Sequence, residues 1–193
     1  MVRVGVLAVQ GDFLEHSQAL ERVGLQSVEV RLPEQLENVD GLIIPGGEST
    51  TIVQLIDIYK FRDSLKAKSS SGFPIWGTCA GMIVMASDLT DKRPVPLKLM
   101  DIVVTRNAFG RQIDSFEADI SVEGITDGPF KAVFIRAPIV TKVGKGVEIL
   151  AKLDNGNAVA VRQRNLLATA FHPELTNDSR MHLLFAEMIE DST

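Results

Sequence analysis

The single cysteine of this 193-residue chain lies between two glycines in the stretch GTCAG, residues 77–81. An apolar run before it predicts a strand, and residues 80–86 predict a helix, so Cys79 marks the turn between them. Such a corner is typical of a nucleophile elbow, whose flanking glycines avoid a clash. A helix N-terminus favours the thiolate and leaves the Ala80 N–H free to stabilise an oxyanion. The pattern indicates nucleophilic chemistry; the alternative is a buried cysteine acting as a small apolar residue.

A base for this thiol is expected at His172, which follows the apolar run LLATAF. Pro173 disfavours a helical conformation for the residue before it. In an extended chain, residues two apart face the same way, which would place Glu174 beside His172. A carboxylate there can fix the tautomer of the imidazole, so Cys79, His172 and Glu174 form a candidate triad. The alternative is a His-Pro turn with a surface glutamate.

The stretch IIPGGEST, residues 43–50, could complete such a site. It leaves an apolar strand through Pro-Gly-Gly and enters a helix that starts with the capping-type residues Glu-Ser-Thr. Paired glycines let the backbone approach a ligand, so this loop could supply a second oxyanion donor opposite Ala80. The alternative is a simple turn. A phosphate loop is excluded, because no lysine follows the glycines at the required spacing.

The elements that must position these residues alternate between strand and helix in the first half of the chain. This alternation predicts an α/β fold with a parallel sheet and helices on both faces. Ligands bind at the edge of such a sheet where the strands end. Strands are expected at 2–9, 26–32, 41–44 and 73–78, and helices at 13–23, 51–65 and 80–86.

The second half of the chain has strands too closely spaced for helices between them, so part of the sheet should be antiparallel. The final segment, 181–189, has the apolar stripe of a helix packed on the sheet. His16 and His182 fall in predicted helices among charged residues and are expected to be solvated or locally satisfied. Residues 88–99 are the most loop-like. The additional strands are expected at 101–105, 116–122, 131–136, 147–153, 158–162 and 166–171.

Composition limits the classes of protein that are possible. Hydrophobic residues make up 45% and charged residues 23%, which predicts a single globular domain over residues 1–193. No apolar run is long enough to cross a bilayer, and the first residues lack the cleavage site of a signal peptide. A net charge of −5 argues against a nucleic-acid partner. One cysteine excludes an internal disulfide and fits a reducing, cytoplasmic compartment.

Five stretches together make the chain similar to a known family: GTCAG, PGGEST, FHPEL, RNAFGRQIDSFEAD and VFIRAP. They resemble the glutaminase subunits of pyridoxal phosphate synthase, which are class I, triad-type glutamine amidotransferases. The resemblance spans nearly the whole chain. It implies a flavodoxin-like, three-layer α/β fold and the hydrolysis of L-glutamine to L-glutamate and ammonia, with no cofactor and no metal.

The resemblance also implies roles for individual residues. Cys79 would be the nucleophile, His172 the general base and acid, and Glu174 its orienting partner. Arg106 or Arg136 could hold the α-carboxylate of glutamine bidentately, or could form a structural ion pair instead. The residues implied to contact glutamine are Gly47, Glu48, Ser49, Arg106, Ile135 and Arg136.

The implied partner is a (β/α)8-barrel synthase subunit that takes up the ammonia to build pyridoxal 5'-phosphate in a large hetero-oligomer, without nucleic acid or membrane. The stretch LAVQGD, residues 7–12, resembles the part of this family near the oxyanion site and the partner. Residues 92–101 depart from the family, which has a glycine-containing loop there. Two alternatives remain open: a cysteine hydrolase or stress protein of the related elbow superfamily, and a non-catalytic flavodoxin-like binding module.

Overall fold

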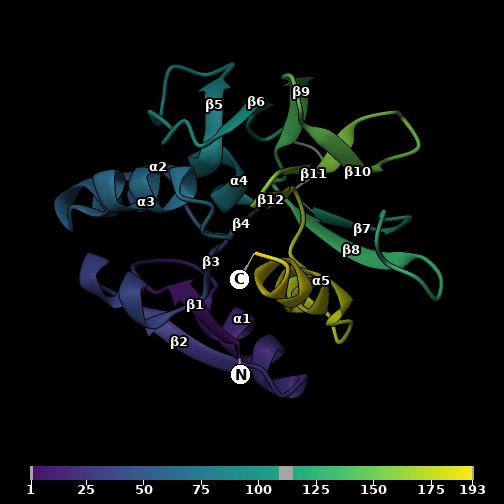
Figure 1. The fold of residues 1–193 in the computed structure, drawn as a ribbon. Coiled ribbons are helices and arrows are strands. Elements are labelled where there is room, and N and C mark those ends of the chain that lie inside the picture. The colour runs from purple at the N-terminus through teal and green to yellow at the C-terminus, as the bar shows by residue number, and fades with distance from the viewer. Residues whose placement is uncertain (1, 109–114, 193) are drawn as a thin grey trace.

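The first half of the chain alternates strands and helices, as the sequence predicts (Figure 1). The structure, a computed structural model, describes residues 2–108 and 115–192. The strands β3 and β4 are buried along their whole length, which explains their continuous apolar runs. The elements are β1 (Arg3–Leu7), α1 (Phe13–Arg22), β2 (Gln26–Val30), the 3-10 helix η1 (Pro33–Asn38), β3 (Gly41–Ile44), α2 (Ser49–Ile58), α3 (Phe61–Ser70), β4 (Ile75–Thr78) and α4 (Ala80–Met85).

The second half is mostly strand and ends in a helix. Its connections are too short for crossover helices, so neighbouring strands pair antiparallel where they follow one another closely. The elements are β5 (Ala86–Leu89), β6 (Met100–Thr105), β7 (Ser115–Ile120), β8 (Phe130–Ile135), β9 (Ile139–Val143), β10 (Glu148–Lys152), β11 (Ala158–Gln163), β12 (Leu166–Thr169), the 3-10 helix η2 (Pro173–Leu175) and α5 (Arg180–Glu190).

One large sheet carries most of these strands, in the order β2-β1-β3-β4-β12-β11-β9-β6-β5, with β10 beside β11. Strands β2, β1, β3, β4 and β12 are parallel, and their order is that of flavodoxin-like folds. From β12 to β6 the pairing is antiparallel. Strands β7 and β8 form a separate hairpin. The predicted fold class is confirmed, including the antiparallel part.

Helices cover both faces of the parallel part of the sheet. On one face, the Trp76 ring of β4 contacts His16 of α1 and Phe185 of α5, with ring centroids 5.8 and 5.6 Å apart. Figure 1 shows α2 and α3 on the opposite side of the sheet from α5. Within the described residues, no helix has the length and apolar character needed to span a membrane.

Several elements differ from the sequence prediction. The helix expected at 51–65 is two helices, α2 and α3, because Lys60 adopts a left-handed φ of 63°. Buried Ile56, Phe61 and Leu65 continue the apolar stripe across this break, so periodicity gives no sign of it. Strand β9 was not predicted, since most of its residues face solvent and lack an apolar pattern. Strand β5 occupies the start of the region expected to be a loop.

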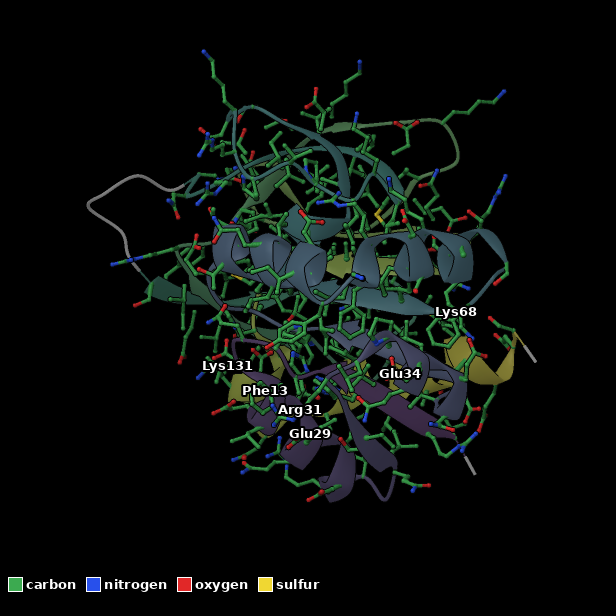
Figure 2. The ribbon with its side chains drawn as sticks, turned by 90° about the vertical axis from the view of Figure 1, so that its left-hand side faces the viewer. Phe13, Glu29, Arg31, Glu34, Lys68 and Lys131 are labelled. Carbon is green, nitrogen blue, oxygen red and sulfur yellow. The ribbon has the colours of Figure 1, made fainter. Side chains whose placement is uncertain are left out.

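Arg31, at the end of β2, fixes the loop that follows β1. Its guanidinium donates to the carbonyl of Ala8 (3.0 Å) and forms an ion pair with Glu29 (2.6 Å). It also lies 5.4 Å from the ring centroid of Phe13, the first residue of α1. Figure 2 shows Phe13, Glu29 and Arg31 close together. The arrangement holds residues 8–12 at the end of the parallel strands.

Candidate active site

Cys79 lies at a sharp corner between β4 and α4. Its backbone dihedrals, φ 47° and ψ −102°, are uncommon for a residue with a side chain. The Cys79 N–H donates to the carbonyl of Thr169 on β12 (2.8 Å), and the Cys79 carbonyl accepts from the N–H of Met82 (3.1 Å). These hydrogen bonds from two elements hold the strained residue in place. The corner expected from the sequence is therefore present.

The two glycines around Cys79 allow α4 to pack directly on the sheet. A Cβ at Gly77 would lie 2.5 Å from the carbonyl group of Gly81, and a Cβ at Gly81 would overlap the carbonyl oxygen of Ile44. Backbone atoms cannot move aside as the end of a side chain can. Any larger residue at either position would therefore push α4 away from β3 and β4.

His172 and Glu174 form a buried pair beyond the end of β12. The Nδ1 of His172 lies 2.7 Å from Oε1 of Glu174, and the side chains are 5% and 0% exposed. The expected pairing is present, but the expected geometry was wrong. Glu174 lies in the 3-10 turn η2 rather than in an extended chain, and only His172 keeps the non-helical conformation that Pro173 requires.

Opposing effects act on the pKa values of this pair. Burial alone would lower the pKa of His172, but the neighbouring Cys79 and the hydrogen-bonded carboxylate of Glu174 raise it to about 10. Burial raises the pKa of Glu174, against the effect of its hydrogen bond with His172. Among the described residues, Nε2 of His172 makes no hydrogen bond. The imidazolium form is stabilised by Cys79 and the Glu174 carboxylate, and Nε2 is available to exchange a proton.

Cys79 and His172 open into one cleft of about 410 Å³. Ala80, whose N–H was expected to serve as an oxyanion donor, also lines it. The cleft lies where β3, β4 and β8 end, which is the edge expected to bind ligands. The structure brings all six residues expected to contact substrate to its wall: Gly47, Glu48, Ser49, Arg106, Ile135 and Arg136.

Glu48 serves as the N-cap of α2 and faces the cleft at the same time. Its carboxylate accepts hydrogen bonds from the N–H groups of Thr50 (3.2 Å) and Thr51 (2.7 Å). Burial acts to raise the pKa of Glu48, but these hydrogen bonds outweigh it and lower the pKa. Arg106 lies 3.6 Å from the same carboxylate and donates to the carbonyl of Arg93 (2.8 Å). Glu48 thereby holds a guanidinium at the edge of the cleft.

The motifs FIRAP and RNAFGRQ also reach the cleft. The carbonyl oxygen of Ile135 lies 3.7 Å from Sγ of Cys79. Arg136, the first residue after β8, has a left-handed φ of 44°. Arg106 and Asn107, at the start of RNAFGRQ, line the cleft, whereas positions 109–112 of that motif lie outside the described residues.

The loop 8–12 contributes two residues that the sequence indicated only as part of LAVQGD. Gln10 Oε1 accepts from the N–H of Glu48 (3.0 Å), and the Asp12 N–H donates to the carbonyl of Gly46 (3.1 Å). Oδ2 of Asp12 lies 3.5 Å from Nδ1 of His172. Ligand atoms of Asp12, His172 and Glu174 lie within 4.8 Å of one another, but a metal there would displace the hydrogen bond between His172 and Glu174.

His16 and His182 are fully buried, so of the two expected states, solvated or locally satisfied, the first is wrong and the second holds for His16. Nδ1 of His16 lies 3.0 Å from Nε2 of His182, and Nε2 of His16 lies 3.0 Å from Oγ1 of Thr78 and 3.3 Å from Oε2 of Glu174. A helical pattern could have placed His16 inward, because Ala19 three residues later is also buried. Nothing in the sequence pairs it with Glu174.

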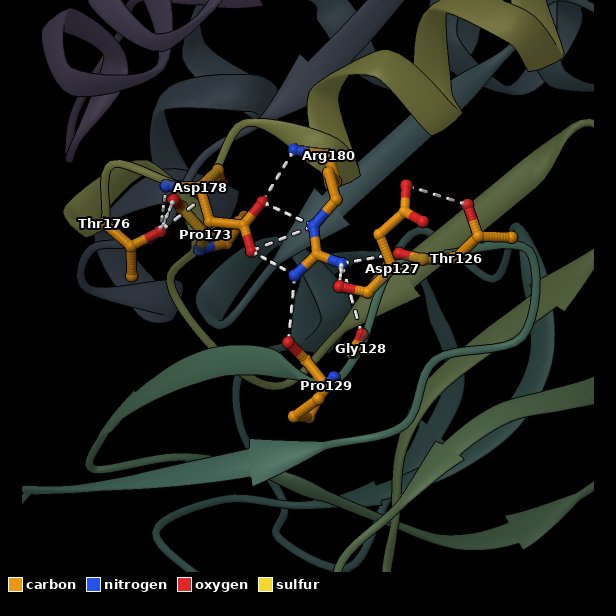
Figure 3. Close-up of polar contacts among 8 residues, drawn as sticks. All are labelled: Thr126, Asp127, Gly128, Pro129, Pro173, Thr176, Asp178 and Arg180. Carbon is orange, nitrogen blue, oxygen red and sulfur yellow. Dashed lines mark hydrogen bonds and ion pairs between the residues drawn. The ribbon is translucent and has the colours of Figure 1, made fainter.

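Arg180 anchors the segment that follows Glu174 (Figure 3). Its guanidinium binds the carboxylate of Asp178, with a shortest distance of 2.6 Å, and donates to the carbonyls of Thr126 (2.6 Å) and Pro129 (2.9 Å). The hydrogen bonds from Arg180 lower the pKa of Asp178. They join the connection between η2 and α5 to the turn before β8, which restricts the movement of the turn that carries Glu174.

The fold and the site together define a class of protein. A cysteine at an elbow, beside a buried histidine–carboxylate pair on a flavodoxin-like sheet, is the arrangement of cysteine enzymes that attack a carbonyl carbon. Residues 6–191 match the model of the SNO glutamine amidotransferase family. The chain belongs to this family.

Curated relatives and solved structures agree with this assignment. The chain is 57% identical over 189 residues to the pyridoxal 5'-phosphate synthase subunit PdxT of Dehalococcoides mccartyi, with 97% of each chain covered. It is 54% identical to the same subunit of Frankia alni, with 98% of this chain and 96% of the relative covered. A crystal structure of a glutamine amidotransferase, 48% identical, superposes with a TM-score of 0.92 over 97% of this chain and 98% of the other.

Proposed function

We propose that this chain is the glutaminase subunit of a pyridoxal 5'-phosphate synthase and hydrolyses L-glutamine to L-glutamate and ammonia. The observation that carries the proposal is that Cys79 and His172 line one cleft while the buried Glu174 pairs with His172, in a chain of the glutamine amidotransferase family. Residues 1–193 would form a single glutaminase domain. The names of its relatives support the assignment to the synthase, and the chemistry of the site supports the assignment of the reaction.

Cys79, His172 and Glu174 would carry the reaction as nucleophile, general base and acid, and orienting carboxylate. The Cys79 thiolate attacks the side-chain amide carbon of glutamine, and the resulting oxyanion accepts hydrogen bonds from the N–H groups of Ala80 and Gly47. The His172 imidazolium gives its Nε2 proton to the amide nitrogen, ammonia leaves, and a thioester forms. His172 then takes a proton from water, whose oxygen attacks the thioester and releases glutamate and the thiolate. Glu174 holds Nδ1–H throughout.

The wall of the cleft offers groups for the amino-acid end of glutamine. A cavity of about 410 Å³ is of a size for one small ligand. Arg106 or Arg136 would bind the α-carboxylate, because a planar guanidinium matches a carboxylate bidentately. Gly47, Glu48, Ser49 and Ile135 would complete the contacts. Glu48 keeps Arg106 at the cleft before substrate arrives.

The ammonia would pass to a barrel-fold synthase subunit within a large hetero-oligomer in the cytoplasm. Ammonia released into water at neutral pH becomes ammonium, which is no nucleophile, so a docked acceptor makes chemical sense. The loop 8–12 and the glycine pair at residues 46–47 lie at the same edge of the sheet as the cleft, which favours this edge for docking.

Glutamate release from purified chain, measured alone and with a purified synthase subunit, tests the proposal. Cys79→Ser should lower turnover by at least about 10³-fold, because a hydroxyl at this corner is a far weaker nucleophile than a thiolate. Unfolding curves of the variant should match those of the wild type, since the substitution removes little volume. Hydrolysis by Cys79→Ser above a tenth of the wild-type rate would contradict the proposal.

A further inference from the structure

His16 is a buried histidine that the proposed chemistry leaves without a role. It lies on α1, with its side chain fully buried, against the carboxylate of Glu174. While Oε1 of Glu174 pairs with His172, Oε2 makes no well-aligned hydrogen bond among the described residues. Nε2 of His16 is 3.3 Å from this oxygen and 3.0 Å from Oγ1 of Thr78. One N–H at Nε2 could therefore serve both oxygens.

The buried contacts determine which nitrogen of each ring carries the proton. Burial is the main effect that holds the pKa of His16 well below its usual range, so its ring is neutral with one N–H. His182 is also neutral, because burial lowers its pKa to about 3. Nδ1 of His182 has no partner in the described parts of the chain. A buried donor without a partner is costly, so the N–H of His182 belongs at Nε2, facing His16.

With its N–H at Nε2, His182 donates toward His16, and His16 in turn donates toward Glu174. His182 Nε2–H donates to Nδ1 of His16 across 3.0 Å, which leaves the single N–H of His16 at Nε2. That N–H faces Thr78 Oγ1 and Glu174 Oε2. In the opposite tautomer, a lone pair of His16 would face a carboxylate oxygen, which is repulsive. The Glu174 carboxylate and the unpartnered Nδ1 of His182 are thus two independent reasons for the Nε2–H tautomer of His16.

We propose that His16 is a positioning residue for glutamine hydrolysis, which holds Glu174 from the side opposite His172. The inference rests on the proposed function, because it assigns a role relative to the same triad. Glu174 sits on a short 3-10 turn, and its side chain is fully buried between His172 and His16. The His172 ring at Oε1 and the polar N–H of His16, 3.3 Å from Oε2, lie on opposite sides of the carboxylate and restrict its plane, and with it the direction of the His172 ring.

Substitutions at His16 separate positioning from packing. His16→Leu removes the donor and keeps an apolar side chain, whereas His16→Gln places an amide N–H near the position of Nε2. Phe185→Leu is the matched control, because it also replaces a buried ring that contacts Trp76 by a leucine. Turnover of the full chain is measured with the synthase present, and KM is obtained in the same assay.

We expect His16→Leu to lower kcat by about 10- to 100-fold with KM changed by less than about threefold, as for other outer partners of functional histidines. His16→Gln and Phe185→Leu should stay within about threefold of wild type. A His16→Leu variant with kcat within about threefold of wild type would overturn the proposal. Equal losses in His16→Leu and Phe185→Leu would also overturn it, by showing a packing role.

NMR of the wild-type chain tests the same inference without any variant that must fold. The chain has three histidines, so ring 15N–1H correlations can be assigned with few variants. His16 should appear as the neutral Nε2–H tautomer, and the Nδ1–H tautomer would refute the proposed direction of donation. Because this readout needs no substrate, it separates the two proposals. A wild-type chain without glutaminase activity, even with the synthase present, but with the Nε2–H tautomer would refute the proposed function and leave only the direction of donation standing.

Discussion

Replacing Gly46 by alanine should disable the site while leaving the fold intact. The φ of Gly46 lies outside the left-handed region, so its backbone conformation suits alanine. The added Cβ would lie 2.9 Å from Nδ1 of His172, 2.9 Å from Oδ2 of Asp12, and against Cε1 of the His172 ring. The substitution is therefore a steric probe of the imidazole position.

The size of the effect follows from these contacts. Non-bonded carbon contacts are optimal at about 3.5–4.0 Å, so the ring must move by about 1 Å to accommodate the methyl group. The ring cannot move freely, because Nδ1 is bound to Glu174 at 2.7 Å and the His172 N–H donates to the carbonyl of Val133 at 2.8 Å. A displacement of about 1 Å at a reacting group costs about 10²-fold in rate. We expect kcat of Gly46→Ala to fall by that factor.

The assay is glutamate release at saturating glutamine with the synthase subunit present, together with thermal unfolding. Gly41→Ala is the matched control: its Cβ would lie 2.5 Å from Cδ1 of Ile189, the end of a flexible core side chain far from the cleft. It should lose stability and keep its turnover. A folded Gly46→Ala variant with kcat within about threefold of wild type would refute the imidazole position described for His172.

Two further predictions concern the buried polar groups. Glu174→Gln should lower kcat by about 10²- to 10⁴-fold with little change in KM, because the amide cannot stabilise the His172 imidazolium; a loss seen only in KM would make Glu174 a substrate residue. Stability should fall as pH drops from 6.5 toward 3, since His16 and His182 have lowered pKa values when folded and take up protons only on unfolding. Each histidine lowers the free energy of unfolding by about 1.4 kcal/mol per pH unit in this range, and Glu174 partly offsets the loss. The free energy of unfolding of His182→Gln, measured with urea, should therefore depend less steeply on pH. An unchanged slope would contradict this prediction.

Much of the fold could be predicted from the sequence because its signals are local. Apolar runs that are buried on both faces predict β3 and β4, and the glycines of GTCAG predict the corner after β4. The failures have physical causes. A left-handed Lys60 interrupts a helix whose apolar stripe continues, and β9 is a strand through its pairing with β6 rather than through its own pattern.

The candidate site was predictable where neighbouring residues in the sequence are also neighbours in space. His172 and Glu174 are two residues apart, and their pairing was expected, although the turn that produces it was not. His16 and Glu174 are 158 positions apart in the sequence, and no local pattern encodes their contact. Burial of a polar residue on an amphipathic helix was the available signal, and its partner could only come from the structure.

The register between β4 and β12 explains how Cys79 and His172, which are far apart in the sequence, come to lie at one site. These strands pair in parallel, with Thr78 opposite Thr169. Cys79 is the next residue on one strand, and its N–H binds the carbonyl of Thr169, so the elbow is built on the partner strand. His172 comes three residues after that same partner. A shift of the register by one residue would turn every side chain of β12 to the other face and separate the base from the thiol. The sheet pairing, more than either motif, therefore sets the geometry of the reaction.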